Sequence, residues 1–215
     1  MRDISGWTEF LDSQFFNLFD HSLILRELII QIRRVANPPS TVIEVGCGSG
    51  LTSVLLASMR YRVTAVDANA QLVEKVKRFE ATFSNLISIQ ADMFRMEFKD
   101  KTFDIAFSQG VLEHYYDENI VRALLEQRRI AQVVVIDVPN GRGKIGDYGD
   151  ERSISPLRWR KLIQTSGLAI VNESARGMAR WSERQPKPLG WLEDLWLSRR
   201  FGENSIFVCK EANNV

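Results

Sequence analysis

The chain has few of the residues that hold small proteins together covalently or through metal ions. Among its 215 residues there are two cysteines and two histidines. Cys47 and Cys209 lie far apart in apolar segments, and their spacing matches neither a metal site nor a disulfide framework, so we interpret both as packing residues. His21 lies between two expected helices and is interpreted as a helix cap.

Long apolar runs and an excess of charge of one sign are also missing. No run of eighteen apolar residues occurs, and the first residues lack the basic and apolar regions of a signal peptide, so we expect a cytoplasmic protein without a membrane span. The formal net charge of +1 excludes a strongly cationic nucleic-acid binder. The expected partner is therefore a small molecule and no nucleic acid, and the chain is expected to be a monomer or a homodimer.

The second half of the chain is mildly basic, and two interpretations of this stay open. The simpler one is a solvated surface. The alternative is a site for an anionic acceptor, formed by Arg176, Arg180 and Arg184 or by Arg158, Arg160 and Lys161.

Length and periodicity predict a single domain over 1–215. Helical spacing of apolar residues over 7–19 and 23–35 predicts N-terminal helices within 1–36. Short β-branched runs then alternate with helical segments, which is typical of a parallel sheet covered on both faces. The expected strands are 41–46, 62–67, 86–92, 103–109, 131–139, 168–174 and 204–211, with helices over 51–59, 70–79 and 118–129 and one opening at Ser155-Pro156.

The most informative segment is Glu44-Val45-Gly46-Cys47-Gly48-Ser49-Gly50, between the first strand and the following helix. Glycines at alternate positions allow a sharp turn and a close approach of the backbone to a flat, nucleotide-like ligand. A dinucleotide-binding turn needs its third glycine one position later, where Leu51 stands, and a phosphate-binding loop needs a Gly-Lys pair. The spacing therefore argues against NAD, FAD and nucleoside triphosphates.

This segment resembles the first motif of the class I, Rossmann-like methyltransferases, small-molecule (methyltransferase type 11/25-like) branch. The resemblance is clear over 41–140, the expected cofactor-binding half, and holds in outline over 140–215, the acceptor side with an insertion at about 175–203. It implies S-adenosylmethionine as cofactor and an α/β three-layer sandwich. The implied sheet has seven strands, mostly parallel, in the order 3-2-1-4-5-7-6 with the last strand antiparallel. Glu44 would face the ammonium group of the cofactor directly or through a water.

Two further acids follow the next two expected strands. Asp67, at the end of VTAVD, can accept both hydroxyls of a ribose, and the alternative role is an N-cap for the helix from Ala68 onward. By resemblance, Asp92 accepts from the adenine amino group, while Met93 and Phe94 cover the ring. The cofactor-binding residues expected overall are Glu44, Gly46, Cys47, Gly48, Gly50, Asp67, Ala68, Asp92, Met93, Phe94, Ser108, Gln109 and Gly110.

The loop after the fourth strand, SQGVLEH, resembles the segment that touches the methionine part of the cofactor in this family. Ser108, Gln109 and Gly110 are expected there. His114 is the candidate general base, with packing and capping as the alternative. Alignment in a dry site can supply much of the catalysis of methyl transfer without any base.

Several functions remain open beside methyl transfer to a small metabolite. They are a cofactor-binding scaffold without activity, a protein or nucleic-acid methyltransferase, an aminopropyl transferase and an NAD-linked enzyme. An aminopropyl transferase needs acids after the fourth strand, where Glu113 alone occurs. The tryptophans of the insertion, Trp181, Trp191 and Trp196, are interpreted as an acceptor wall, a membrane-surface patch, packing or a dimer contact.

Overall fold

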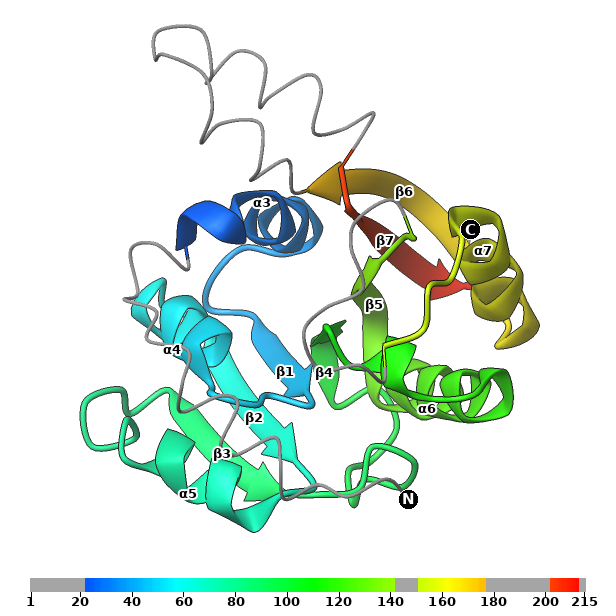
Figure 1. Cartoon of the computed structure of the whole chain (residues 1–215). Coiled ribbons are helices and arrows are strands. Elements are labelled where there is room, and N and C mark those ends of the chain that lie inside the picture. The colour runs from blue at the N-terminus through cyan, green and yellow to red at the C-terminus, as the bar shows by residue number, and fades with distance from the viewer. Residues whose placement is uncertain (1–21, 142–150, 177–201, 213–215) are drawn as a thin grey trace, which may run out of the picture.

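A single seven-stranded sheet organises the part of the chain that the structure, a computed structural model, describes, namely residues 22–141, 151–176 and 202–212 (Figure 1). The strands lie in the order β3-β2-β1-β4-β5-β7-β6. β1 to β5 pair in parallel, and β7 runs antiparallel to both β5 and β6. The fold class and strand order predicted from the sequence are confirmed.

The elements have bounds close to those expected from periodicity. The strands are β1 (Thr41–Val45), β2 (Arg62–Asp67), β3 (Leu86–Gln90), β4 (Phe103–Gln109), β5 (Ala131–Pro139), β6 (Leu168–Arg176) and β7 (Asn204–Glu211). The helices are α3 (Arg26–Val35), α4 (Leu51–Ser58), α5 (Ala70–Lys77), the 3-10 turn η1 (Leu112–His114), α6 (Asp117–Ile130) and α7 (Pro156–Thr165).

Two apolar cores lie on opposite faces of the sheet because the central strands bury both of their faces. One core joins the sheet to α3, α4 and α5, and the other joins it to α6 and α7. Figure 1 shows these two groups of helices on opposite sides of the strands. Successive side chains of a strand point to opposite faces, which explains why the strands are apolar nearly throughout instead of alternating.

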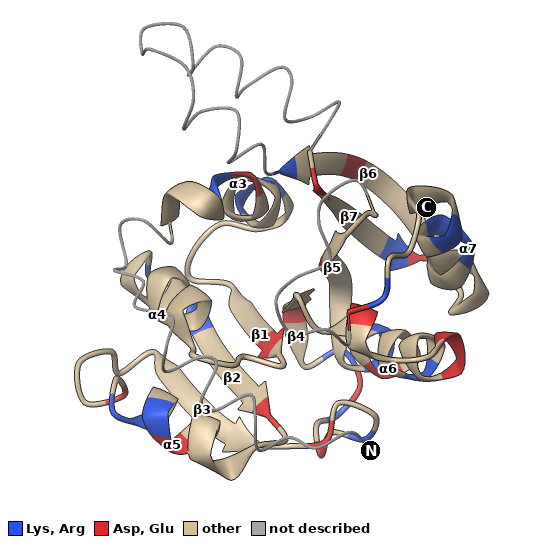
Figure 2. Cartoon of the chain, viewed as in Figure 1, with Lys and Arg blue, Asp and Glu red and all other residues tan. Residues whose placement is uncertain are grey.

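The parallel pairing brings the carboxyl ends of β1 to β5 to one edge of the sheet. Val45 pairs with Val66, and Asp67 pairs with Gln90. Acidic residues follow or end several of these strands, and Figure 2 shows acidic positions where β1 and β2 end. In open α/β sheets this edge is where ligands bind.

Two predicted bounds were wrong in detail, and one alternative role is excluded. α3 begins at Arg26, after a separate helical turn over 22–24, instead of at residue 23. β3 ends at Gln90 instead of 92, because Asp92 leaves the ladder and accepts the backbone N–H of Phe94 at 2.9 Å. The N-cap of α5 is Asn69, whose side chain accepts from Gln71, so Asp67 does not cap that helix.

Other expectations fall outside the described residues. They concern the helix over 7–19, His21, most of the loop over 140–149, and Arg180, Arg184, Trp181, Trp191 and Trp196 in the insertion. Within the described ranges, no helix is long and apolar enough to cross a membrane.

Candidate functional site

The glycine-rich turn after β1 has a backbone that only glycine adopts easily. Its φ angles are 77° at Gly46, 52° at Gly48 and 74° at Gly50, all in the left-handed region. A Cβ atom on Gly46 would lie 2.7 Å from a methyl carbon of Val111, and one on Gly50 would lie 2.4 Å from a methyl carbon of Val76. The turn therefore packs tightly against neighbouring side chains, and the alternate glycines are needed for its shape.

Asp67 joins this turn to the end of β2. Its two carboxylate oxygens accept from the backbone N–H of Gly48 at 3.0 Å and from that of Asn69 at 2.9 Å. Each carboxylate oxygen can accept a second hydrogen bond. The half-buried carboxylate thus has acceptor capacity left for the two hydroxyls of a ribose, and this role stays a prediction.

Glu44 lies inside the packing between β1 and α4. It is buried, and Ser53 Oγ donates to its Oε2 at 2.5 Å. Burial, with a smaller contribution from the charge of Asp67, raises the pKa of Glu44 to about 8 despite the opposing effect of Ser53. Through this hydrogen bond the Glu44 side chain links β1 to α4. Its contact with the ammonium group of the expected cofactor stays a prediction.

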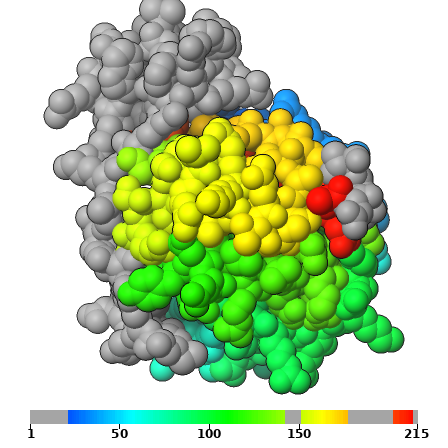
Figure 3. Space-filling view, turned by 90° about the vertical axis from the view of Figure 1, so that its right-hand side faces the viewer, coloured from blue at the N-terminus to red at the C-terminus, as the bar shows by residue number. Residues whose placement is uncertain are grey.

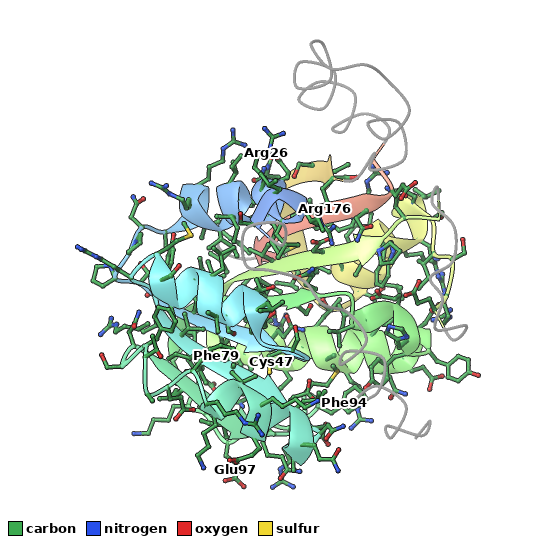
Figure 4. All side chains as sticks on the ribbon, turned by 60° about the vertical axis from the view of Figure 1, so that its left-hand side comes forward. Arg26, Cys47, Phe79, Phe94, Glu97 and Arg176 are labelled. Atoms are coloured by element: carbon green, nitrogen blue, oxygen red, sulfur yellow. The ribbon has the colours of Figure 1, made fainter. Side chains whose placement is uncertain are left out.

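Cys47 also packs, as the sequence indicated. Its thiol is buried at the start of α4, where Figure 4 labels it, and burial raises its pKa. Cys209 is likewise buried, within β7.

The turn after β3 brings Phe94 against the loop after β4. Asp92 accepts from Phe94 N–H and, through its backbone oxygen, from Arg95 N–H at 3.0 Å. The Phe94 ring meets the Tyr115 ring edge to face, with centroids 5.4 Å apart, and the guanidinium of Arg122 lies 5.0 Å from the Phe94 centroid. The Met93 side chain is also buried. This arrangement supports an apolar wall beside the strand ends.

The loop after β4 is held by hydrogen bonds to α4 and to β5. Gln109 accepts from the hydroxyl of Thr52 at 3.0 Å, and Gly110 N–H donates to the carbonyl of Asp137 at 3.0 Å. Ser108 is 1% exposed, and its hydroxyl has no hydrogen-bond partner. His114, the candidate base, ends η1 and is half-buried.

Glu113 is not among the site residues predicted from the sequence. Its side chain is 2% exposed, and Oε2 has no hydrogen-bond partner among the described residues. Burial is the main cause that raises the pKa of Glu113 to about 8; the charges of Glu151 and Asp137 contribute to the rise, and a backbone hydrogen bond and Arg176 oppose it. An acid within an apolar turn directly after a core strand was the signal available in the sequence.

Asp137 is a second buried acid that was missed. Arg176 Nε donates to Asp137 Oδ2 at 2.5 Å, and Asn204 donates to Oδ1 at 3.1 Å. Figure 4 labels Arg176, at the end of β6. The single acid in the otherwise apolar run AQVVVIDVP was the available signal.

The three described arginines of the candidate anionic-acceptor sites each bond a carboxylate of the chain. Arg176 bonds Asp137, Arg160 bonds Glu173 at 2.8 Å, and Arg158 bonds Asp117. These pairs leave the proposed anionic-acceptor site without support among the described residues.

Comparisons with known proteins agree with this geometry. A family model for a methyltransferase domain matches residues 43–133. The uncharacterized methyltransferase YodH of Bacillus subtilis is 31% identical over 140 residues, which cover 65% of this chain and 56% of YodH. A ubiquinone biosynthesis O-methyltransferase of Xanthomonas campestris is 37% identical over 97 residues, or 42% of this chain and 39% of that protein. The matched segments thus span about half the length of these relatives or less.

Solved structures show the same fold across nearly the whole chain. The complex between the Haloferax volcanii Trm112 methyltransferase activator and the putative methyltransferase matches with a TM-score of 0.71 and 16% identity, covering 98% of this chain and 99% of that one. The topology, the glycine turn and the matched domain model lead to one assignment. The chain has the class I, Rossmann-like methyltransferase fold, and its residues 43–133 match the methyltransferase domain.

Proposed function

We propose that this protein binds S-adenosylmethionine at the carboxyl edge of β1 to β4 and transfers its methyl group to a small-molecule acceptor. The observation that carries the proposal is the hydrogen bond from Gly48 N–H to Asp67, which fixes the glycine turn beside a carboxylate with acceptor capacity left. That pairing suits a nucleoside, because the turn lets the backbone come close to the ligand while the carboxylate can accept ribose hydroxyls.

The residues present fit this cofactor. It carries no phosphate, and the turn has neither the lysine nor the Gly-x-x-Gly spacing that phosphate-bearing ligands need. Asp67 would hold the ribose, Asp92 and Phe94 would border the adenine, and Gly110 would lie by the methionine part. When bound, the cofactor supplies a methyl group on a positively charged sulfur.

The chain's own contribution to the reaction is alignment in a site shielded from water. Gly110 is fixed through its N–H on Asp137, and Gln109 through Thr52, so the loop that would border the methyl group is anchored on both sides. Rigid placement of two reactants in line removes much of the entropic part of a displacement barrier. Where the acceptor must lose a proton, a general base lowers the barrier further.

Two alternatives are separated by experiment. A scaffold without activity would bind the cofactor but transfer no methyl group. A protein methyltransferase would label macromolecules and not metabolites. The names of relatives include both an O-methyltransferase of ubiquinone biosynthesis and an eEF1A lysine and N-terminal methyltransferase, so the choice between these acceptors rests on experiment.

The test is calorimetric titration of the full-length protein with S-adenosylhomocysteine, followed by transfer of radiolabelled methyl groups in cell extract. We expect Asp67→Asn to weaken binding at least tenfold, since a charge-assisted hydrogen bond contributes about 1.5 to 3 kcal/mol. Asp100→Asn is the matched control, because Asp100 is exposed and precedes β4 at the opposite edge of the sheet. Label in the small-molecule fraction supports the proposal, and absence of binding by the wild-type protein refutes it.

A further inference from the structure

We propose that the acceptor is an amine, and that Glu113 binds its nitrogen and takes up the proton that nitrogen releases. This inference rests on the proposed function, since it concerns the acceptor side of the same site. It assigns a role to a residue that was not among the site residues predicted from the sequence.

The position of the Glu113 carboxyl group is the first argument. Oε1 lies 3.7 Å from where a Cβ atom of Gly110 would stand, and it is the only atom of the described residues, chain neighbours apart, within 4 Å of that point. The space beside Gly110 is therefore bordered by the carboxyl group of Glu113. This is the loop expected beside the transferred methyl group.

The second argument is an unmet hydrogen-bonding capacity. Oε2 of Glu113 and Oγ of Ser108, both almost fully buried, have no hydrogen-bond partner within the part of the chain that the structure describes. Buried polar atoms are rarely left unpaired, because each one costs about 1 to 3 kcal/mol. Two such oxygens near the end of the same strand indicate a polar ligand, and an ammonium group, with three N–H donors, can pair with both once Glu113 has lost its proton.

The third argument is the sign of the charge around Glu113. Its pKa responds to the carboxylates of Glu151 and Asp137 and to one cation, Arg176. Arg176 is already bonded to Asp137, so the pair adds little net charge. Asp137 and Arg176 therefore cancel, and this pair does not favour an anionic acceptor over a positively charged one.

The surrounding contacts hold Glu113 in this place. Arg152 N–H donates to the Glu113 carbonyl at 3.1 Å, and the Arg152 guanidinium donates to the Tyr115 carbonyl at 2.6 Å and to Asp117 at 2.8 Å. Arg158 bonds the other oxygen of Asp117. Figure 3 shows the surface of the segment from 151 through α7 lying directly against that of the α6 region.

The chemistry follows from the protonation state of this carboxyl group. An ammonium ion has no free electron pair, so it must lose a proton before it can accept a methyl group. The N–H bond breaks as an O–H bond forms on Glu113, and nitrogen keeps the electron pair. That pair would then bond the methyl carbon, whose bond to the cofactor sulfur would break with its electrons left on sulfur. Burial, which raises the pKa of Glu113 to about 8 in the ligand-free protein, favours this proton uptake over that by an exposed carboxylate.

The experiment measures amine binding to the full-length protein saturated with S-adenosylhomocysteine. Ethylamine, ethanolamine and putrescine are titrated by calorimetry at neutral pH in two buffers of different ionisation enthalpy, with catechol as the oxygen-acceptor comparison. We expect at least one amine to bind with release of about one proton per site, because a protonated Glu113 must ionise to pair with an ammonium ion.

The variants separate a role in acceptor binding from a structural one. Glu113→Gln should weaken amine binding at least tenfold and abolish proton release, while affinity for S-adenosylhomocysteine stays within about twofold. Glu118→Gln makes the same change at an exposed position of α6. It should leave amine affinity, proton release and affinity for S-adenosylhomocysteine unchanged. Circular dichroism of each variant reports whether it folds.

The outcomes are distinct. Absence of S-adenosylhomocysteine binding by the wild-type protein overturns the proposed function, and this inference with it. Cofactor-product binding without binding of any amine overturns this inference alone. This inference alone is also overturned if catechol binds in preference to the amines, or if Glu113→Gln binds amines and releases protons like the wild-type protein.

Discussion

Replacing Glu113 with glutamine should make the protein more stable at neutral and alkaline pH. The pKa of Glu113 rises from an ordinary 4.5 to about 8 in the folded chain, mainly through burial. Between these two values the unfolded chain releases the proton while the folded chain retains it. The stability that the protonated group contributes is therefore complete below about pH 4.5 and is lost as the pH rises through about 8.

The size of the effect follows from the same values. Each pH unit over which only the folded state holds the proton lowers the free energy of unfolding by about 1.4 kcal/mol. Across the interval from 4.5 to about 8 the wild-type protein loses up to roughly 5 kcal/mol relative to a variant whose side chain does not titrate. Glu44 has a similarly raised pKa, but it is present in both proteins and cancels in the difference.

The assay is urea unfolding followed by circular dichroism, on the wild-type protein, Glu113→Gln and Glu118→Gln, at several values from about pH 5 to about pH 8. The difference in unfolding free energy between Glu113→Gln and the wild-type protein should grow steadily with pH and level off above about 8. Glu118→Gln reports the effect of the same chemical change at an exposed position. A difference for Glu113→Gln that is constant with pH would refute the reasoning, because it would mean that Glu113 titrates alike in both states.

Two further predictions concern stability. Gly50→Ala should lower the free energy of unfolding by about 1 to 3 kcal/mol in urea titrations, because φ is 74° and the new Cβ would lie 2.4 Å from Val76. A urea titration curve for Gly50→Ala that matches that of the wild-type protein would contradict the argument. Asp137→Ala should lower the free energy of unfolding by about 3 to 5 kcal/mol, since it leaves the mostly buried Arg176 without its partner. The double variant Asp137→Leu, Arg176→Met should lose less unfolding free energy than Asp137→Ala alone. Equal losses would show that the unpaired cation does not cause the destabilisation.

The strands were predictable because burial on both faces leaves an unbroken apolar signal. The segments 131–139 and 204–211 were bounded correctly from their β-branched and aromatic content alone. Ser155 before Pro156 likewise marked the start of α7, where the Ser155 hydroxyl accepts from Arg158 N–H at 3.3 Å. Such signals are local, so the sequence carries them directly.

The sequence was wrong or left alternatives open where a polar side chain had a choice of partners. Asp67 was an alternative cap for α5, but Asn69 takes that place, and Asp67 accepts from Gly48 across the turn. Asp92 could have continued β3, but its carboxylate closes a turn on Phe94. The outcome depends on which backbone N–H groups the fold brings within reach, and neighbours in the sequence do not reveal it.

The sequence by itself determined the alternation of strands and helices, the glycine turn and the acids after successive strands. These follow from backbone conformation and side-chain period, which depend on neighbouring residues. Only the tertiary structure decided that Glu113 is buried with its Oε2 unpaired among the described residues, that Asp137 is paired with Arg176, and that their charges act on one another. Burial and electrostatic potential are set by groups distant in the sequence, because the fold alone removes water and brings those groups together.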